Sequence, residues 1–101
     1  MSWSERYRIK SKEWVNADAA ANILEETKSA VLSQMMVKLG DIPVSRAEMQ
    51  VKASEDWHKF LTVMVNAREC SNLLKVEVEW IKMKSAEEQS QAATARAEMR
   101  L

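Results

Sequence analysis

His58 is the only histidine of the chain, so histidine chemistry near neutral pH would have to start from it. Ser54 and Glu55 precede it by four and three residues, so a Ser–His–Glu triad can be drawn on one helical face. Three side chains within one helical turn point outward in parallel, however, and do not converge on a substrate. We therefore expect no catalytic residue in this stretch and interpret it as the exposed start of a helix.

The only cysteine, Cys70, follows Arg68 and Glu69. A neighbouring arginine lowers the pKa of a thiol, but the adjacent glutamate offsets that charge, so we interpret Cys70 as a small residue at a helix junction. One cysteine and one histidine cannot make a Cys/His zinc site. The single Glu-x-x-His, Glu55 to His58, has no second copy with which to build a di-metal site. We expect no metal and no cofactor, and a lone cysteine is typical of a reduced intracellular setting.

Basic and aromatic residues alternate near the N-terminus, in WSERYRIKSKEW. If this stretch were an extended arm, four cations would lie on one side and could hold nucleic-acid phosphates while the rings stack on bases: Arg6, Arg8, Lys10 and Lys12. Alternatively, the aromatic residues pack on the rest of the protein or anchor a protein partner: Trp3, Tyr7 and Trp14. Because the net charge of the chain is zero, we favour the second interpretation.

The amino-acid composition indicates which kind of secondary structure carries these residues. With 101 residues the chain makes one domain, and its 47% hydrophobic and 30% charged residues are an ordinary globular balance. One glycine and one proline leave little material for the turns of an all-β fold, so we predict an all-α protein. No apolar run reaches the ~18 residues of a membrane span and no signal peptide is apparent, so we expect a cytoplasmic protein.

Helical periodicity predicts a first helix over 16–39, capped by Asn16 and ended by Gly40. The segment 1–15 before it is predicted to be the basic and aromatic arm.

A second helix is predicted over 45–69, after a connection containing Pro43. Ser45 and Glu48 have the spacing of a capping box at its start. A second helix-start signal, Ser54-Glu55-Asp56, follows residue 53 and indicates a break in the helix there.

The polar residues 66–72 either form a turn or continue a helix into the following residues. We favour the turn, because an uninterrupted helix of about 60 Å would not fit inside a compact monomer. Residues 73–84 alternate as a strand would, but their flanks are helical, so we predict a third helix over 73–98. The apolar residues expected in the core include two tryptophans and four methionines: Trp57, Trp80, Met35, Met36, Met64 and Met83.

The predicted fold is a small three-helix bundle, an antiparallel hairpin with a long C-terminal helix. Residues 85–101 favour helix but carry little apolar surface, so this end projects, frays or docks on a second chain. We therefore expect a homodimer or a complex with another protein, in which the N-terminal aromatic residues act together with three residues of this end: Ala92, Arg96 and Met99.

The two ends, SERYRIKSKEWV and KVEVEWIKMKSAEEQSQAATARAEMRL, resemble small helical proteins of unknown function encoded by bacteriophages and prophages. The resemblance implies an accessory protein inside the bacterial cell. Such a protein would bind or inhibit a host factor, assemble with itself, or serve phage DNA replication or recombination as a single-stranded nucleic-acid-binding factor. It transfers no catalytic residue to this chain, and we expect a non-enzymatic protein.

Overall fold

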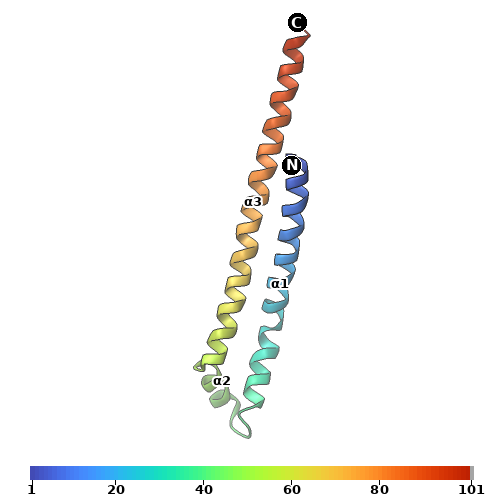
Figure 1. Ribbon diagram of the computed structural model, residues 1–101. Coiled ribbons are helices and arrows are strands. Elements are labelled where there is room, and N and C mark those ends of the chain that lie inside the picture. The colour runs from blue at the N-terminus through green and yellow to red at the C-terminus, as the bar shows by residue number, and fades with distance from the viewer. Residues whose placement is uncertain (101) are drawn as a thin grey trace.

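The computed structural model describes residues 1–100, which form three helices and no strand: α1 (Trp3–Val37), α2 (Val44–Lys52) and α3 (Glu55–Met99). The predicted all-α class is therefore confirmed. Helices α1 and α3 lie side by side and antiparallel, and α2 occupies the end where the chain reverses (Figure 1). The molecule measures 83 × 18 × 16 Å, so the compact three-helix bundle is not confirmed.

The N-terminal segment is helical from Trp3 onward, so the predictions of a separate basic and aromatic arm over 1–15 and of a helix start at Asn16 are wrong. Ser2 caps α1, because its side-chain oxygen accepts a hydrogen bond from the Glu5 backbone N–H at 3.2 Å. Ser2 and Glu5 have the S-x-x-E spacing of a capping box, so the sequence carried the signal for this earlier start.

Gly40 follows α1 with a φ of +88°, which confirms its predicted left-handed conformation. The predicted capping box at Ser45 is wrong. Helix α2 begins one residue earlier, at Val44, with Pro43 in the capping position and no side-chain hydrogen bond to the helix end.

The predicted break near residue 53 is confirmed, since α2 ends at Lys52 and α3 begins at Glu55. Ser54 caps α3: its hydroxyl accepts from the Trp57 backbone N–H at 3.2 Å and donates to the Val51 carbonyl at 2.6 Å. The predicted helix over 45–69 is thus divided between two elements.

Helix α3 continues through residues 66–72, so the predicted turn there is wrong, and the separate third helix over 73–98 is the second half of α3. The helical interpretation of 73–84 is confirmed. Two side chains of the polar stretch, Arg68 and Ser71, hydrogen-bond to α1, so their polarity serves contacts between helices. The objection that a helix this long cannot fit a compact monomer does not apply to a molecule 83 Å long.

The two long helices pack through residues that recur every seven positions, the spacing of a coiled coil. On α1 these seam residues are Trp3, Tyr7, Lys10, Trp14, Ala17, Ala21, Leu24, Lys28, Val31 and Met35. On α3 they are Trp57, Phe60, Met64, Ala67, Ser71, Leu74, Val78 and Ile81. Most of them are buried or half-buried, which places the seam between the helices.

Small residues occupy the middle of the seam. Ala21 is fully buried and Ser71 is 1% exposed. The Asp18–Ser71 hydrogen bond and the Lys10–Glu77 ion pair set an antiparallel register that places Ala21 opposite Ala67. Small side chains at this level let the two helices approach closely.

The C-terminal end of α3 extends past the start of α1 (Figure 1). Trp3, the first residue of α1, packs against Trp80, and the rest of α3 continues beyond that contact. We call residues 86–100 the projecting end. Their side chains are all exposed, in agreement with the predicted lack of apolar cover, and Leu101 lies outside the described residues.

Candidate interaction surface

Aromatic side chains gather where α1 begins. The rings of Trp3 and Trp80 meet edge to face, with centroids 5.7 Å apart and an interplanar angle of 74°. The guanidinium carbon of Arg6 lies 4.9 Å from the centroid of the Trp3 ring, and the Lys84 ammonium lies 5.8 Å from that of Trp80. This cluster joins the N-terminus of α1 to α3.

The remaining aromatic residues predicted to bind a partner, Tyr7 and Trp14, are seam residues of the same helix. Tyr7 is 38% exposed and Trp14 is half-buried. Much of the surface of Trp3 and of Trp14 is therefore buried within the hairpin.

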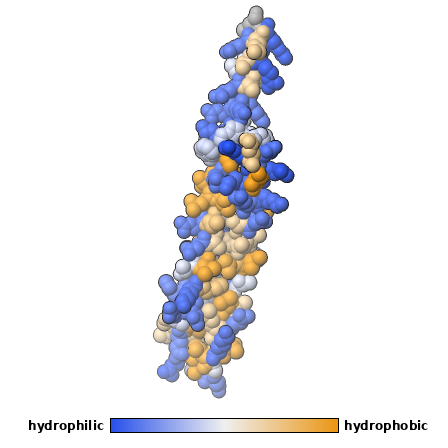
Figure 2. All heavy atoms as spheres, in the orientation of Figure 1, coloured by the Kyte–Doolittle hydropathy of each residue, from blue (hydrophilic) through white to orange (hydrophobic). Residues whose placement is uncertain are grey.

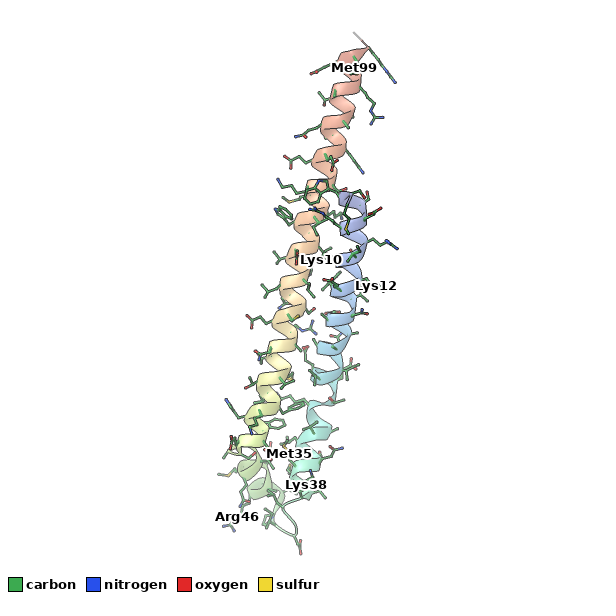
Figure 3. The ribbon with its side chains drawn as sticks, in the orientation of Figure 1. Lys10, Lys12, Met35, Lys38, Arg46 and Met99 are labelled. Atoms are coloured by element: carbon green, nitrogen blue, oxygen red, sulfur yellow. The ribbon has the colours of Figure 1, made fainter. Side chains whose placement is uncertain are left out.

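The four N-terminal cations do not share one side, because the segment that carries them is helical and not extended. Lys10 faces α3, where its ammonium lies 3.1 Å from Glu13 and 3.6 Å from Glu77, whereas Lys12 lies on the outer side of α1 (Figure 3). The hydrogen bond with Glu13 raises the pKa of Lys10. Arg6 covers Trp3 and lies on the same side of α1 as Lys10, whereas Arg8 and Lys12, also four residues apart, share another face of the helix.

The structure does not place Ala92, Arg96 and Met99 beside the N-terminal aromatic residues, because these three belong to the projecting end. Met99 is 87% exposed and lies far from Lys10 and Lys12 (Figure 3). Arg96 donates a hydrogen bond to the Ala92 carbonyl of its own helix at 3.3 Å. The predicted composite surface is therefore two separate regions.

An ion-pair cluster, which the sequence analysis missed, joins the middles of the two helices. The Arg68 guanidinium donates to Asp18 Oδ1 at 2.6 Å, to Asn22 Oδ1 at 2.6 Å and to Glu25 Oε1 at 2.9 Å. The Ser71 hydroxyl donates to the same Asp18 oxygen at 3.2 Å. Asp18 and Glu25 stand seven residues apart beside the seam, a spacing that could have revealed the cluster.

This cluster perturbs the ionisation of its members. The hydrogen bonds from Arg68 lower the pKa of Asp18 and of Glu25 below the ordinary carboxyl values, and partial desolvation opposes the shift. The same pairs raise the pKa of Arg68. All five side chains of the cluster are already paired with each other, so the cluster works as a clamp between the two helices.

The residues considered for catalysis have other roles or no partner of the required kind. Ser54 uses its hydroxyl to cap α3 and is not available to His58. His58 and Cys70 are exposed on α3, and Cys70 is a free thiol. Among residues 1–100, no group of three or more histidine, cysteine, aspartate or glutamate side chains is arranged to hold a metal ion.

By their heptad positions, a set of uncharged residues lies on the side of the hairpin opposite Asp18, Glu25 and Arg68. It lies between Glu13 on α1 and the pair Lys59 and Glu77 on α3. We call it the uncharged face, and its residues, all exposed, are Asn16, Ala20, Ile23, Thr27 and Ala30 of α1 with Val63, Asn66, Cys70 and Leu73 of α3. Asn16 and Ala30 are 14 positions apart, so the face extends about 21 Å along the hairpin.

Large apolar side chains on this face remain open to solvent. Ile23 is 62%, Val63 56% and Leu73 64% exposed. Leu73 stands at the outer edge of the face, because it also lines a pocket with Arg68 and Glu25. Further along the same side, Ile9 and Trp80 line one pocket of about 320 Å³. Figure 2 shows apolar surface distributed along the two-helix part of the molecule, whereas hydrophilic residues dominate the projecting end.

The heptad positions explain two wrong core predictions. Trp80 is 49% and Met83 65% exposed, since both lie off the seam on α3, although Trp57 is buried as expected. Met35, Met36 and Met64 are half-buried. A 3.6-residue period does not separate the seam residues from exposed apolar residues such as Trp80 and Met83, whereas a seven-residue period does.

The seam and the Arg68 cluster together define an antiparallel coiled-coil hairpin, and the uncharged face is its solvent-exposed apolar side. Comparisons with models of protein families, with curated proteins and with solved structures find no match for this chain. Within residues 1–100, none of the helices combines the length and apolar character that crossing a membrane requires.

Proposed function

We propose that this chain is a non-enzymatic accessory protein that acts by binding protein, either a further copy of itself or a host factor. The single observation that carries the proposal is the uncharged face. Exposed apolar residues scattered singly are normal, but contiguous apolar surface bounded by charges is typical of an interaction site. Ile23, Val63 and Leu73 give this face its large apolar side chains.

The resemblance of the two ends of the chain to small phage and prophage proteins supports a setting in the cytoplasm of a bacterial cell. In that setting, binding would serve either self-assembly or the inhibition of a bacterial protein. A single-stranded nucleic-acid-binding role has weaker support, because Arg6 and Lys10 already contact a tryptophan ring and two carboxylates.

The test combines two measurements on the whole chain. Light scattering gives the mass in solution, and a crosslinked pull-down from a bacterial lysate, quantified by mass spectrometry, tests for a second protein. We expect a mass above that of the monomer or specific capture that the Val63→Glu variant loses. A monomer that captures nothing specific would refute the proposal.

A further inference from the structure

The chain exposes more surface than a compact monomer of its mass would, which leaves area for a partner to cover. A compact monomer of this mass exposes roughly 5,800 Å². This chain exposes 7843 Å². The difference, about 2,000 Å², lies within the area that each subunit of an obligate homodimer buries, roughly 1,000 to 2,500 Å².

We infer that a second copy of this chain docks antiparallel on the uncharged face, so that two hairpins form a four-helix bundle. This inference rests on the proposed function and specifies its partner. The middle of the face suits close packing of helices, because Ala20 and Cys70 are small and the α3 residues of this face between Lys59 and Glu77 carry no charge. Two identical faces meeting about a two-fold axis would cover Ile23, Val63 and Leu73 of both copies.

The opposite side of the hairpin is a poor alternative for the same contact. It carries the cluster of Arg68, Asp18 and Glu25, whose charged groups are already paired with each other. Docking a second hairpin there would desolvate these ion pairs without supplying new partners. The distribution of charge therefore selects the uncharged face.

The antiparallel direction follows from what each hairpin leaves uncovered at its two ends. The projecting end lies at one extreme of the molecule, with Met99 near its tip, and α2 lies at the other, near Arg46 (Figure 3). Val44 and Met49 of α2 are 72% and 73% exposed. The antiparallel arrangement brings the start of the projecting end of each copy next to α2 of the other and so covers Val44 and Met49, whereas a parallel pair would place the two projecting ends, which carry little apolar surface, beside each other.

Two valines of α3 provide a matched pair of variants. Val63, on the uncharged face, is 56% exposed, and Val65, on the opposite side, is 58% exposed. Val63→Glu buries a carboxylate in the proposed interface, so it should raise the dimer dissociation constant by about 30-fold or more, as loss of a central contact does. Val65→Glu adds the same charge outside the interface and should leave the dissociation constant within about threefold.

The measurement is sedimentation or light scattering over a concentration series, with circular dichroism to verify helix content in both variants. A monomeric wild type refutes the dimer. If that monomer still captures a host protein, the proposed function stands and this inference alone falls. A dimer that Val65→Glu weakens as much as Val63→Glu also refutes the inference, since the contact would then lie elsewhere.

The native thiol tests the face without any substitution. Because Cys70 lies near the middle of the uncharged face, a short bis-maleimide should join two copies through it. Maleimide labelling of Cys70 should also slow as the protein concentration rises. Labelling that is independent of concentration, together with no crosslinked dimer, would contradict docking on this face.

The direction is tested by mixing two single-cysteine variants in a Cys70→Ser background, Met49→Cys and Glu87→Cys, because Glu87 lies about as far from Cys70 along α3 as α2 does in the other direction. In the antiparallel dimer the crosslinker should join position 49 of one copy to position 87 of the other. Crosslinks only between identical positions would show a parallel dimer and overturn the proposed orientation.

Discussion

Arg68 Nη1 on α3 lies 2.6 Å from Asp18 Oδ1 on α1, although the two residues are 50 positions apart in the chain. The same guanidinium also reaches Glu25, one heptad along α1. Arg68 thus ties two levels of α1 to one level of α3 and fixes the antiparallel register of the hairpin. A planar fork with five donors suits this geometry better than an ammonium group.

Replacing Arg68 by alanine should lower the melting temperature, because it leaves Asp18 and Glu25 on the same side of α1 without the guanidinium that pairs with both carboxylates. Arg68→Lys should restore part of the loss, since it keeps the charge but not the fork. Lys59→Ala is the control, because Lys59 pairs only with Glu55 of its own helix, at 3.5 Å and in an exposed position. Thermal melts followed by circular dichroism give the comparison. Equal melting temperatures for Arg68→Ala and Lys59→Ala would contradict the clamp.

The lowered pKa values of Asp18 and Glu25 predict a loss of stability in acid. Both carboxyls have a lower pKa in the folded than in the unfolded chain. They therefore stabilise the fold above the ordinary values, 3.8 for Asp18 and 4.5 for Glu25, and this contribution disappears as the pH falls through the lower folded values.

The measurement is the melting temperature from pH 7 to pH 2. A double variant, Asp18→Asn with Glu25→Gln, should show a smaller decrease than wild type over the acidic part of this range. Glu48→Gln with Glu55→Gln removes two exposed carboxylates elsewhere and serves as the control. If both double variants follow the wild-type profile, the cluster does not contribute to the acid dependence.

The fully buried Ala21 should tolerate no larger side chain, because the opposing residue in the seam is also an alanine, Ala67. Ala21→Leu should destabilise the fold by about 1–3 kcal/mol, the usual cost of overpacking a tight core. Ala19→Leu makes the same change at an exposed position of the same helix and should have little effect. Urea denaturation measures both free energies of unfolding. An Ala21→Leu variant as stable as Ala19→Leu would mean that the helices are not close at this level.

Local signals in the sequence predicted the helical class, the left-handed Gly40 and the break before Glu55. Each of these depends on propensity or capping within a few residues. The start of α1 at Trp3 was also encoded locally, by Ser2 and Glu5, but residues 1–15 were predicted to be an arm that precedes the first helix. That error also displaced the predicted nucleic-acid and partner sites.

Contacts between α1 and α3 could not be derived from local signals. Arg68 and Ser71 look like turn residues until Asp18 is known to face them. The assumption of a compact monomer also excluded a continuous α3, although nothing in the composition requires compactness. A seven-residue period in both helices was the one long-range signal, and it would have separated the buried Val78 from the exposed Trp80.

The helical N-terminus predicts that the chain does not bind single-stranded nucleic acid tightly. Arg6 and Lys10 are engaged within the hairpin, so only Arg8 and Lys12 share an open face. We expect no binding of a fluorescent oligonucleotide by anisotropy at moderate salt. Binding that weakens steeply with salt, and that the fourfold alanine variant of Arg6, Arg8, Lys10 and Lys12 abolishes, would restore the nucleic-acid hypothesis.

The exposed projecting end predicts two different outcomes for a truncated chain that stops after Gln89, the last residue of α3 that lines a pocket with Ser4 and Tyr7 of α1. At low concentration, where a dimer dissociates, the melting temperature should match that of the whole chain, because residues 90–100 lie beyond the contacts that close the hairpin. At high concentration the truncated chain should melt earlier, because each copy would lose the contact between its projecting end and α2 of its partner. Melts across a concentration series separate the two cases. A lower melting temperature at every concentration would show that the end stabilises its own hairpin, and equal curves throughout would show that the dimer does not use it.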